Sequence, residues 1–110
     1  HCGGISVKAD ELFRAWGWDP EGTKAAVAAL GLRAAETIGN RLRGASDIGL
    51  DVALDENGHP WILEANFRDL RITFRNAGER DAWVSTFATP VKYAVFLKKN
   101  RGAEDRAAAD

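Results

Sequence analysis

Three side chains with oxygen donors, Asp51, Glu64 and Asn66, stand where they could bind one metal ion together. Glu64 and Asn66 are two positions apart, so their side chains share a face in an extended strand. Two carboxylates and an amide carbonyl suit a hard cation such as Mg²⁺, which keeps waters and takes further ligands from phosphate groups. If Asp51 lies on the same face, the three residues predict a metal and nucleotide-phosphate site.

A β-hairpin would bring Asp51 to that face. The alternating apolar pattern of 48–55 and 59–66 predicts two strands, and Asn57-Gly58 between them is a strong signal for a tight turn. With a two-residue turn at this place, Asp51 lies directly opposite Glu64. By the same count, Gly49 lies opposite Asn66.

The hairpin pattern also has other interpretations. Facing carboxylates repel each other and a divalent cation would remove that repulsion, but a solvated hairpin face gives the same pattern and is the commoner case. A four-residue loop keeps the pairing, whereas a three-residue loop turns Asp51 toward the apolar face. A calcium-binding loop is excluded because Ala53 falls at its first ligand position. The apolar face is expected to carry Leu50, Val52, Trp61 and Leu63.

Helices are predicted on both sides of this hairpin. Helical spacing covers 10–16, and Asp19-Pro20-Glu21 begins a second helix that runs to about Gly44. After a charged stretch that fits a loop or an edge strand, 83–87 and 90–99 predict two further helices, the last ending at Gly102. The expected fold class is therefore α+β, with a small antiparallel sheet packed against helices.

The composition narrows the classes of function. The 110 residues carry 15 basic and 16 acidic side chains, so no broad charge favours nucleic acid or an anionic membrane as a partner. No apolar run reaches the ~20 residues of a membrane span, which favours a cytoplasmic protein. The single cysteine, Cys2, excludes an internal disulfide and a thiolate zinc cluster. The first residue is His1 and methionine is absent, so we expect a piece of a longer protein.

Residues 51–66 resemble the C-terminal metal motif of the ATP-grasp superfamily. That motif has an aspartate at a strand end, a D-x-x-G type turn, and an apolar strand closing in Glu-x-Asn, thirteen positions from aspartate to glutamate. The resemblance implies that Asp51, Glu64 and Asn66 bind the Mg²⁺ (or Mn²⁺) ions that bridge the phosphates of ATP.

Within the superfamily, the chain is most similar to the YheC/YheD-like ATP-grasp proteins associated with bacterial endospore coats. Gly3-Gly4 resembles their Asn-x-x-x-Gly-Gly element, and 90–97 resembles a terminal Pro-x-x-Tyr-Ala-x-x-Leu signature. Arg68 and Arg71 match basic positions after the Glu-x-Asn motif, which makes them candidates for contacts to phosphate or an acidic substrate. The chain departs from the family pattern in the same loop, at Phe67 and Asp69.

The resemblance assigns 1–102 to the C-terminal portion of an ATP-grasp domain. Residues 103–110 have little apolar surface to bury and are expected to form a flexible tail. It implies a carboxylate–amine (or carboxylate–thiol) ligase that works through an acylphosphate, with ATP and a carboxylate as substrates. The lysines and the hinge that hold ATP in the family lie in an upstream half, so we expect the piece alone to be inactive. No residue is assigned as general acid or base.

The alternative is a non-catalytic structural or interaction module with a vestigial metal face. This alternative is supported by the absence from this chain of the half that holds adenine in the family. Separately, four tryptophans are more often core or interface anchors than stacking platforms, and their number suggests an exposed former interface. A homo-oligomer is a further candidate arrangement. His59 beside the turn is interpreted as an exposed polar residue rather than a base. The four tryptophans are Trp16, Trp18, Trp61 and Trp83.

Overall fold

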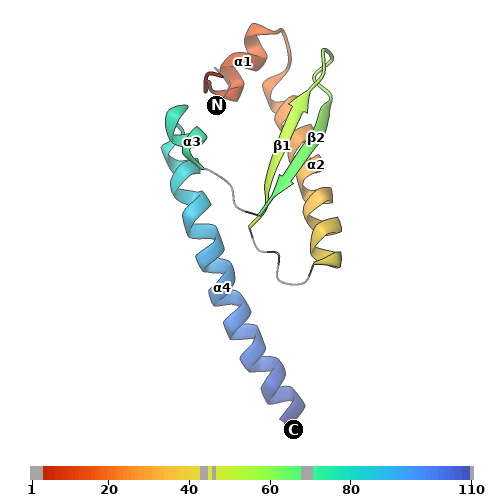
Figure 1. Ribbon diagram of the computed structural model, residues 1–110, viewed down its shortest axis with the longest axis vertical. Coiled ribbons are helices and arrows are strands. Elements are labelled where there is room, and N and C mark those ends of the chain that lie inside the picture. Colours follow the sequence, from red (N-terminus) through yellow and green to blue (C-terminus); the bar gives the residue numbers. More distant parts are fainter. Residues whose placement is uncertain (1–3, 43–44, 46, 68–70, 110) are drawn as a thin grey trace.

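The computed structural model describes residues 4–42, 45, 47–67 and 71–109, with side chains up to Arg101. The chain is α+β, as the sequence predicts, and has four helices and two strands in the described ranges (Figure 1). In chain order these are α1 (Ala9–Ala15), α2 (Pro20–Arg41), β1 (Gly49–Leu54), β2 (Pro60–Asn66), α3 (Ile72–Asn76) and α4 (Arg80–Ala109).

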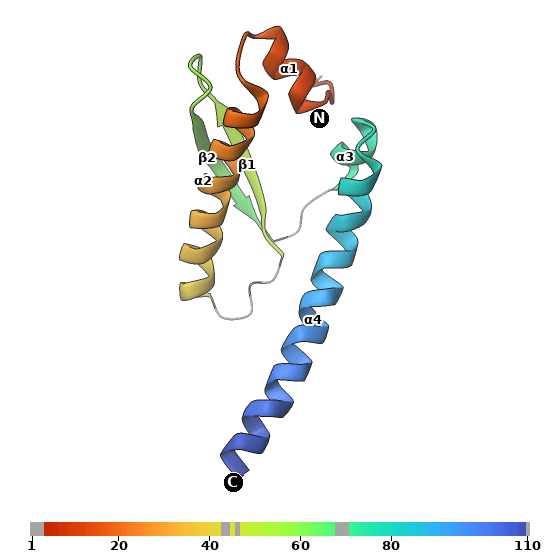
Figure 2. The same ribbon diagram turned by 180° about the vertical axis from the view of Figure 1, so that it is seen from behind.

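Helix α2 begins where the sequence predicts it. The Asp19 carboxylate caps the helix by accepting a hydrogen bond of 2.9 Å from the backbone N–H of Gly22, and Pro20 occupies the first turn. The helix covers one face of the β1–β2 sheet and leaves the other face open (Figures 1 and 2). Its predicted apolar stripe meets the sheet in a shallow groove lined on the two sides by Leu30, Ala34, Ile38, Leu50, Ile62 and Ala65.

The hairpin turn is one residue longer than predicted. The N–H of Gly58 donates to the carbonyl of Asp55 at 2.9 Å, and the N–H of Asp55 donates to the carbonyl of His59 at 3.0 Å. Gly58 has a φ of 76°, which completes a three-residue loop of a common type, a type I turn followed by a left-handed glycine. The predicted two-residue turn at Asn57-Gly58 is therefore wrong.

A β-bulge offsets the longer loop. Near the turn, Val52 pairs with Ile62, but Asp51 pairs with Glu64, so Leu63 is an extra residue on β2. One extra residue in the loop and one in the strand cancel, and the predicted pairing of Asp51 with Glu64 and of Gly49 with Asn66 is confirmed.

The bulge changes which side chains face the helix. Ile62, rather than Trp61 or Leu63, lies against α2. Trp61 is 57% exposed and Leu63 is 72% exposed. The prediction that Trp61 and Leu63 share the covered apolar face with Leu50 is wrong, because alternation shifts by one position on the turn side of the bulge.

The C-terminal part is more helical than predicted. The charged stretch after β2 contains a short helix, α3, which turns at Gly78 with a φ of 77° into α4. Instead of two helices ending at Gly102, α4 is one helix from Arg80 to Ala109 with Pro90 inside it. Proline usually marks a helix start, which is why the sequence predicts a helix beginning at Pro90. The φ of proline also fits a helix interior, where the missing N–H removes one backbone hydrogen bond.

The molecule is elongated because α4 projects from the body (Figure 1). Its radius of gyration is 17.4 Å, against about 13 Å for a compact chain of this length. The accessible surface is 8920 Å², where a compact monomer of this mass would have about 6,000 Å². Among the described large hydrophobic side chains, Phe13 alone is deeply buried, at 6% exposure, and the smaller Pro60 is also buried. Much apolar surface therefore remains uncovered.

Candidate metal and nucleotide site

The hairpin register places the predicted metal ligands on one face. Asp51 and Glu64 are direct cross-strand partners, and both are exposed on the face opposite α2. Asn66 is two positions beyond Glu64, at the strand end, and pairs with Gly49. Because glycine has no side chain, the position opposite the Asn66 amide is open. The fold thus brings all three predicted residues together.

The charge around these residues suits a cation. Residues 47–67 contain five Asp and Glu and no Lys or Arg. None of the ion pairs between described residues involves Asp51 or Glu64. Across the described ranges, no group of three His, Cys, Asp or Glu side chains is placed to hold a metal ion, and the candidate donors here are two carboxylates and one amide. That donor set fits Mg²⁺, which retains waters and binds phosphate oxygens.

Arg71 has partners within the protein. Its guanidinium forms an ion pair with Asp47, just before β1, and lies over the ring of Phe87 in α4 at 5.1 Å. The side chain is 19% exposed. The sequence did not indicate either partner, because they lie far from Arg71 along the chain. The other arginine candidate, Arg68, lies outside the described residues.

A groove beside the open end of the hairpin is where Arg71 could meet a ligand. The groove has a volume of about 550 Å³ and lies between the start of β1 and α4. It is lined by Gly49 at the Asn66 end of the hairpin, by Arg71, and by the hydroxyl side chains Ser85, Thr86 and Thr89. Hydroxyls and a guanidinium suit an anionic ligand, and the one carboxylate in the lining, Asp47, is paired with Arg71.

Asp55 has a structural role in the turn and is not a candidate metal ligand. Its carboxylate accepts hydrogen bonds from the backbone N–H groups of Asn57 and His59 and from Nε1 of Trp61, at 2.9, 3.0 and 3.1 Å. The Trp61 indole, followed by the His59 amide, lowers the pKa of Asp55 below its ordinary value of 3.8. His59 is exposed, as predicted, and its ring lies edge-on to Trp61 at 5.4 Å.

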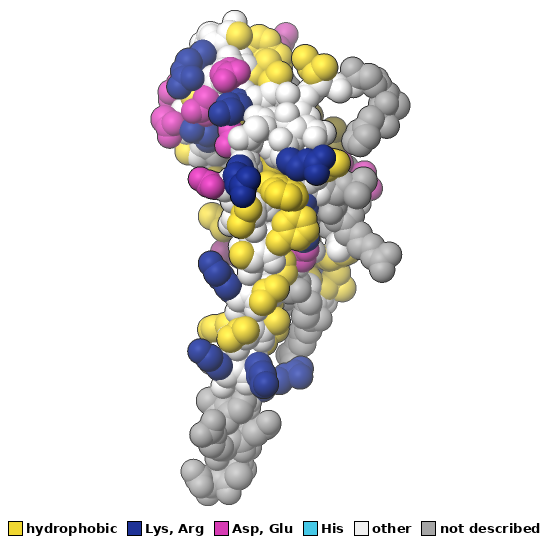
Figure 3. Space-filling model, turned by 90° about the vertical axis from the view of Figure 1, so that its left-hand side faces the viewer, with side chains coloured by type: hydrophobic (Ala, Val, Ile, Leu, Met, Phe, Trp, Pro, Cys, Tyr) yellow, Lys and Arg dark blue, Asp and Glu magenta, His cyan; other side chains and the backbone are white. Residues whose placement is uncertain are grey.

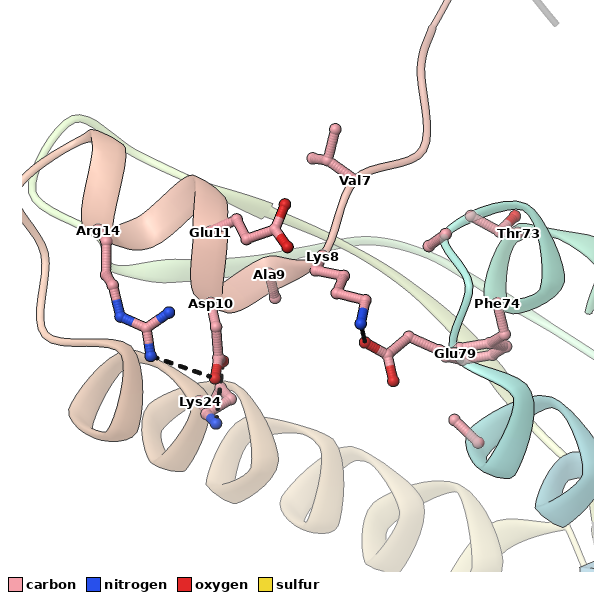
Figure 4. A pocket seen from close by; sticks show the side chains of 12 residues that line it. Val7, Lys8, Ala9, Asp10, Glu11, Arg14, Lys24, Thr73, Phe74 and Glu79 are labelled. Carbon is pink, nitrogen blue, oxygen red and sulfur yellow. Dashed lines mark ion pairs between the residues drawn. The ribbon is translucent and has the colours of Figure 1, made fainter.

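A larger groove, of about 680 Å³, lies between the start of α1 and α3 and contains none of the predicted metal ligands (Figure 4). Its charged side chains mostly pair with one another. Lys24 contacts Glu21 at 2.8 Å and Asp10 at 3.0 Å, which raises the pKa of Lys24, and Lys8 contacts Glu79 at 3.8 Å. The Lys24–Asp10 pair links α1 to α2, and the Lys8–Glu79 pair links the residues just before α1 and just after α3. We therefore assign the groove a structural role.

Comparison with known proteins decides the family. The model of the YheC/D-like ATP-grasp family matches residues 1–97. The chain belongs to this family. Membership of the YheC/D-like ATP-grasp family indicates an ATP-binding, ligase-type function, and ATP-grasp proteins generally use ATP and Mg²⁺. No curated protein and no solved structure gives a significant match.

The match of the YheC/D-like ATP-grasp family covers the whole hairpin and continues into α4 as far as Leu97. The candidate ligands therefore lie inside the matched region. In the described part of this ATP-grasp chain, none of the helices combines the length and apolarity needed to cross a bilayer.

Proposed function

We propose that this chain supplies the Mg²⁺-binding part of an ATP-grasp carboxylate ligase. Asp51, Glu64 and Asn66 hold Mg²⁺, or Mn²⁺, against the phosphates of ATP. The observation that supports this proposal best is the register of the hairpin, which pairs Asp51 with Glu64 in a segment free of positive side chains. Two unpaired facing carboxylates are unfavourable in a purely structural hairpin.

In the proposed reaction, the carboxylate of the substrate attacks the γ-phosphate of ATP and gives an acylphosphate and ADP. An amine, or a thiol, then attacks the acyl carbon and releases phosphate. The bound ion would offset negative charge on the transferred phosphoryl group. Asp51 and Glu64 orient the phosphates through it, while Asn66 adds a neutral oxygen and so limits the negative charge of the site.

Two arginines would contact the phosphates of ATP or the anionic end of the substrate. Arg71 is fixed by Asp47 and Phe87, and a guanidinium has five N–H donors, so it can keep its ion pair and still donate into the groove at Thr86 and Thr89. Arg68 is proposed for the same role on the family pattern alone.

The domain assignment follows the same proposal. Residues 1–102 form the C-terminal portion of the ATP-grasp domain, 103–110 form a tail, and an upstream half supplies the groups that hold adenine. A cytoplasmic location fits this role, because ATP is a cytoplasmic substrate. The alternative, a non-catalytic interaction module, is favoured by one observation, the large uncovered apolar surface of α4.

Calorimetric titration with Mg·ATP and with Mn²⁺ tests the metal site. Glu64→Gln keeps the side-chain shape but removes the charge, so we expect its affinity for Mn²⁺ to fall by about tenfold or more, since loss of even an outer partner of a metal ligand typically costs about 10–100-fold. Glu36→Gln, on the exposed side of α2, is the matched control and should bind as the unaltered chain does. Equal binding by the two variants would remove the support for the site and favour the interaction module.

A further inference from the structure

Exposed apolar side chains lie in two regions, along α4 and at the turn end of the hairpin. In α4, Val91, Phe96 and Leu97 are exposed, and with 3.6 residues per turn they point in three different directions. Figure 3 shows apolar side chains spaced down the helix with Lys and Arg between them. They do not form one bounded site. At the turn end, by contrast, exposed aromatic and acidic side chains line one groove.

This groove lies between the α1–α2 connection and the hairpin turn, which are neighbours at one end of the molecule (Figures 1 and 2). Trp16 and Trp18 line it from the connection, and Leu54, Asp55 and Glu56 line it from the end of β1 and the turn. Its volume is about 370 Å³. Small-molecule sites have volumes of about 300–1,000 Å³, so the groove suits a ligand at the small end of that range.

The backbone after α1 sets the positions of the two tryptophans. The N–H of Trp18 donates to the carbonyl of Phe13 at 2.9 Å, which closes a tight ending to the helix. Gly17 between the tryptophans has a φ of 75°, a conformation that residues with a side chain rarely adopt. The tight ending brings the rings of Trp16 and Trp18 together, edge to face, with centroids 5.0 Å apart.

Trp18 is fixed and in turn supports Trp16. A β-carbon at Gly58 would lie 3.3 Å from the Trp18 indole, so this ring packs directly on the hairpin turn. The deeply buried ring of Phe13 lies 6.0 Å from that of Trp18. Trp16 is 55% exposed, so the aromatic surface that it presents to solvent rests on a fixed neighbour. A preorganised ring costs little conformational entropy when it binds a ligand.

The charge of the groove is negative. Glu56 is exposed and takes part in none of the ion pairs or side-chain hydrogen bonds between described residues. Asp55 is held by the turn but adds its charge to the same lining. No Lys or Arg lines the groove, and none occurs in residues 47–67.

This lining selects the chemistry of a ligand. Among the lining side chains, only the indole N–H groups can donate a hydrogen bond, whereas carboxylates supply acceptors and negative charge. A neutral polyhydroxy ligand needs both kinds of partner. A cation needs only acceptors, and the face of an indole attracts it further. Leu54 adds an apolar contact for alkyl groups around the charge.

We propose that the groove binds a small alkylammonium ion. Its positive nitrogen lies over the exposed indole of Trp16 and near the carboxylate of Glu56, and its alkyl groups contact Leu54. The site is separate from the candidate metal ligands. Leu54 is three positions from Asp51, about 10 Å along β1 at ~3.3 Å per residue, and faces the opposite side of the strand. The groove is therefore free to bind its ligand whether or not the hairpin binds metal.

NMR titration with choline tests the site, because each tryptophan has its own indole N–H signal. We expect choline to shift the signals of Trp16 and Trp18 and to leave unchanged that of Trp83 in α4. The neutral isostere of choline, in which carbon replaces the nitrogen, should bind about tenfold more weakly, because it lacks the charge that the indole and Glu56 attract. The solution contains no Mg²⁺ or ATP, so the result is independent of the metal site.

Two variants separate the aromatic and the ionic contributions. Trp16→Leu keeps an apolar side chain but removes the ring, and should weaken choline binding about tenfold. Glu56→Gln leaves the groove and the fold intact and should weaken it about threefold. Glu64→Gln makes the same charge change on the other face of the hairpin and is the matched control, with binding as in the unaltered chain.

Three results would overturn the proposal. The first is the absence of a choline-dependent shift at Trp16 and Trp18. The second is equal affinity for choline and its neutral isostere, which would show that the groove does not recognise charge. The third is equal weakening by Glu56→Gln and Glu64→Gln, which would show that choline responds only to the overall charge of the hairpin.

Discussion

At the scale of single residues, the carboxylate of Asp55 binds the turn, whereas those of Asp51 and Glu64 are the candidate metal ligands. Asp55 has three hydrogen-bond donors around it and a lowered pKa, whereas Asp51 and Glu64 face each other in a segment without positive charge. A group whose charged form is already satisfied by the protein is a poor metal ligand. The structure therefore separates the turn aspartate from the candidate ligands.

The pKa of Asp55 gives a prediction. Because folding lowers this pKa, the carboxylate contributes stability above its ordinary value of 3.8, and this contribution is lost as the pH falls through the depressed value. Trp61→Phe removes the Nε1–H donor, so we expect the pKa of Asp55, measured by NMR titration, to rise toward its ordinary value. Trp16→Phe, at another exposed tryptophan, should leave it unchanged. A rise of the same size in both variants would contradict the assignment.

At the scale of elements, Arg71 joins three parts of the chain. It lies just before α3, pairs with Asp47 before β1, and stacks on Phe87 of α4. An ion pair at a partly buried position and a cation–π contact each contribute modestly, and together they fix the helix relative to the sheet. This position matters because the groove beside the hairpin lies between β1 and α4.

Removing the Arg71 contacts should destabilise the fold measurably. We expect Arg71→Met to lower the free energy of unfolding by about 1–2 kcal/mol, from the loss of the ion pair and the cation–π contact. Urea denaturation measures the change. Arg75→Met in α3, where the side chain is exposed, is the control and should change stability by less than about 0.5 kcal/mol. Equal losses would mean that the Asp47 and Phe87 contacts contribute nothing.

The bulge at Leu63 gives a second prediction at this scale. Deletion of Leu63 removes the extra residue but keeps Asp51 opposite Glu64 and Gly49 opposite Asn66. We therefore expect the Mn²⁺ affinity to change by no more than about threefold. Deletion of Ala65 moves Asn66 to the face covered by α2 and should weaken binding by about tenfold. The reverse order of the two affinities would contradict the register.

At the scale of the whole molecule, the main feature is the large apolar surface that stays exposed to water. A chain that buries one large side chain deeply in its described part and projects a long helix leaves apolar groups in water. Exposed apolar surface of this extent marks contact with another surface.

X-ray scattering measures the shape directly. At low protein concentration, where the chain is monomeric, we expect a radius of gyration near the 17.4 Å of the structure. A value near the ~13 Å of a compact chain would show that α4 folds back onto its own body.

The sequence by itself determined the features that depend on local order. The cap at Asp19, the two strands, and the Asp51, Glu64 and Asn66 pattern are set by residue types a few positions apart. The family was also recognisable from these spacings, because the aspartate, the turn glycine and the Glu-x-Asn of the family motif all lie within one hairpin.

The tertiary structure decided the features that depend on distant residues, or on two local irregularities that offset each other. A loop one residue longer and a bulge at Leu63 give the pairing of Asp51 with Glu64 by a different route, and they move Trp61 away from the helix. The contacts of Arg71 with Asp47 and Phe87 join residues far apart in the chain. Loop and bulge conformations are close in energy, and long-range contacts leave no periodic signal, so the folded chain selects among alternatives that the sequence pattern permits.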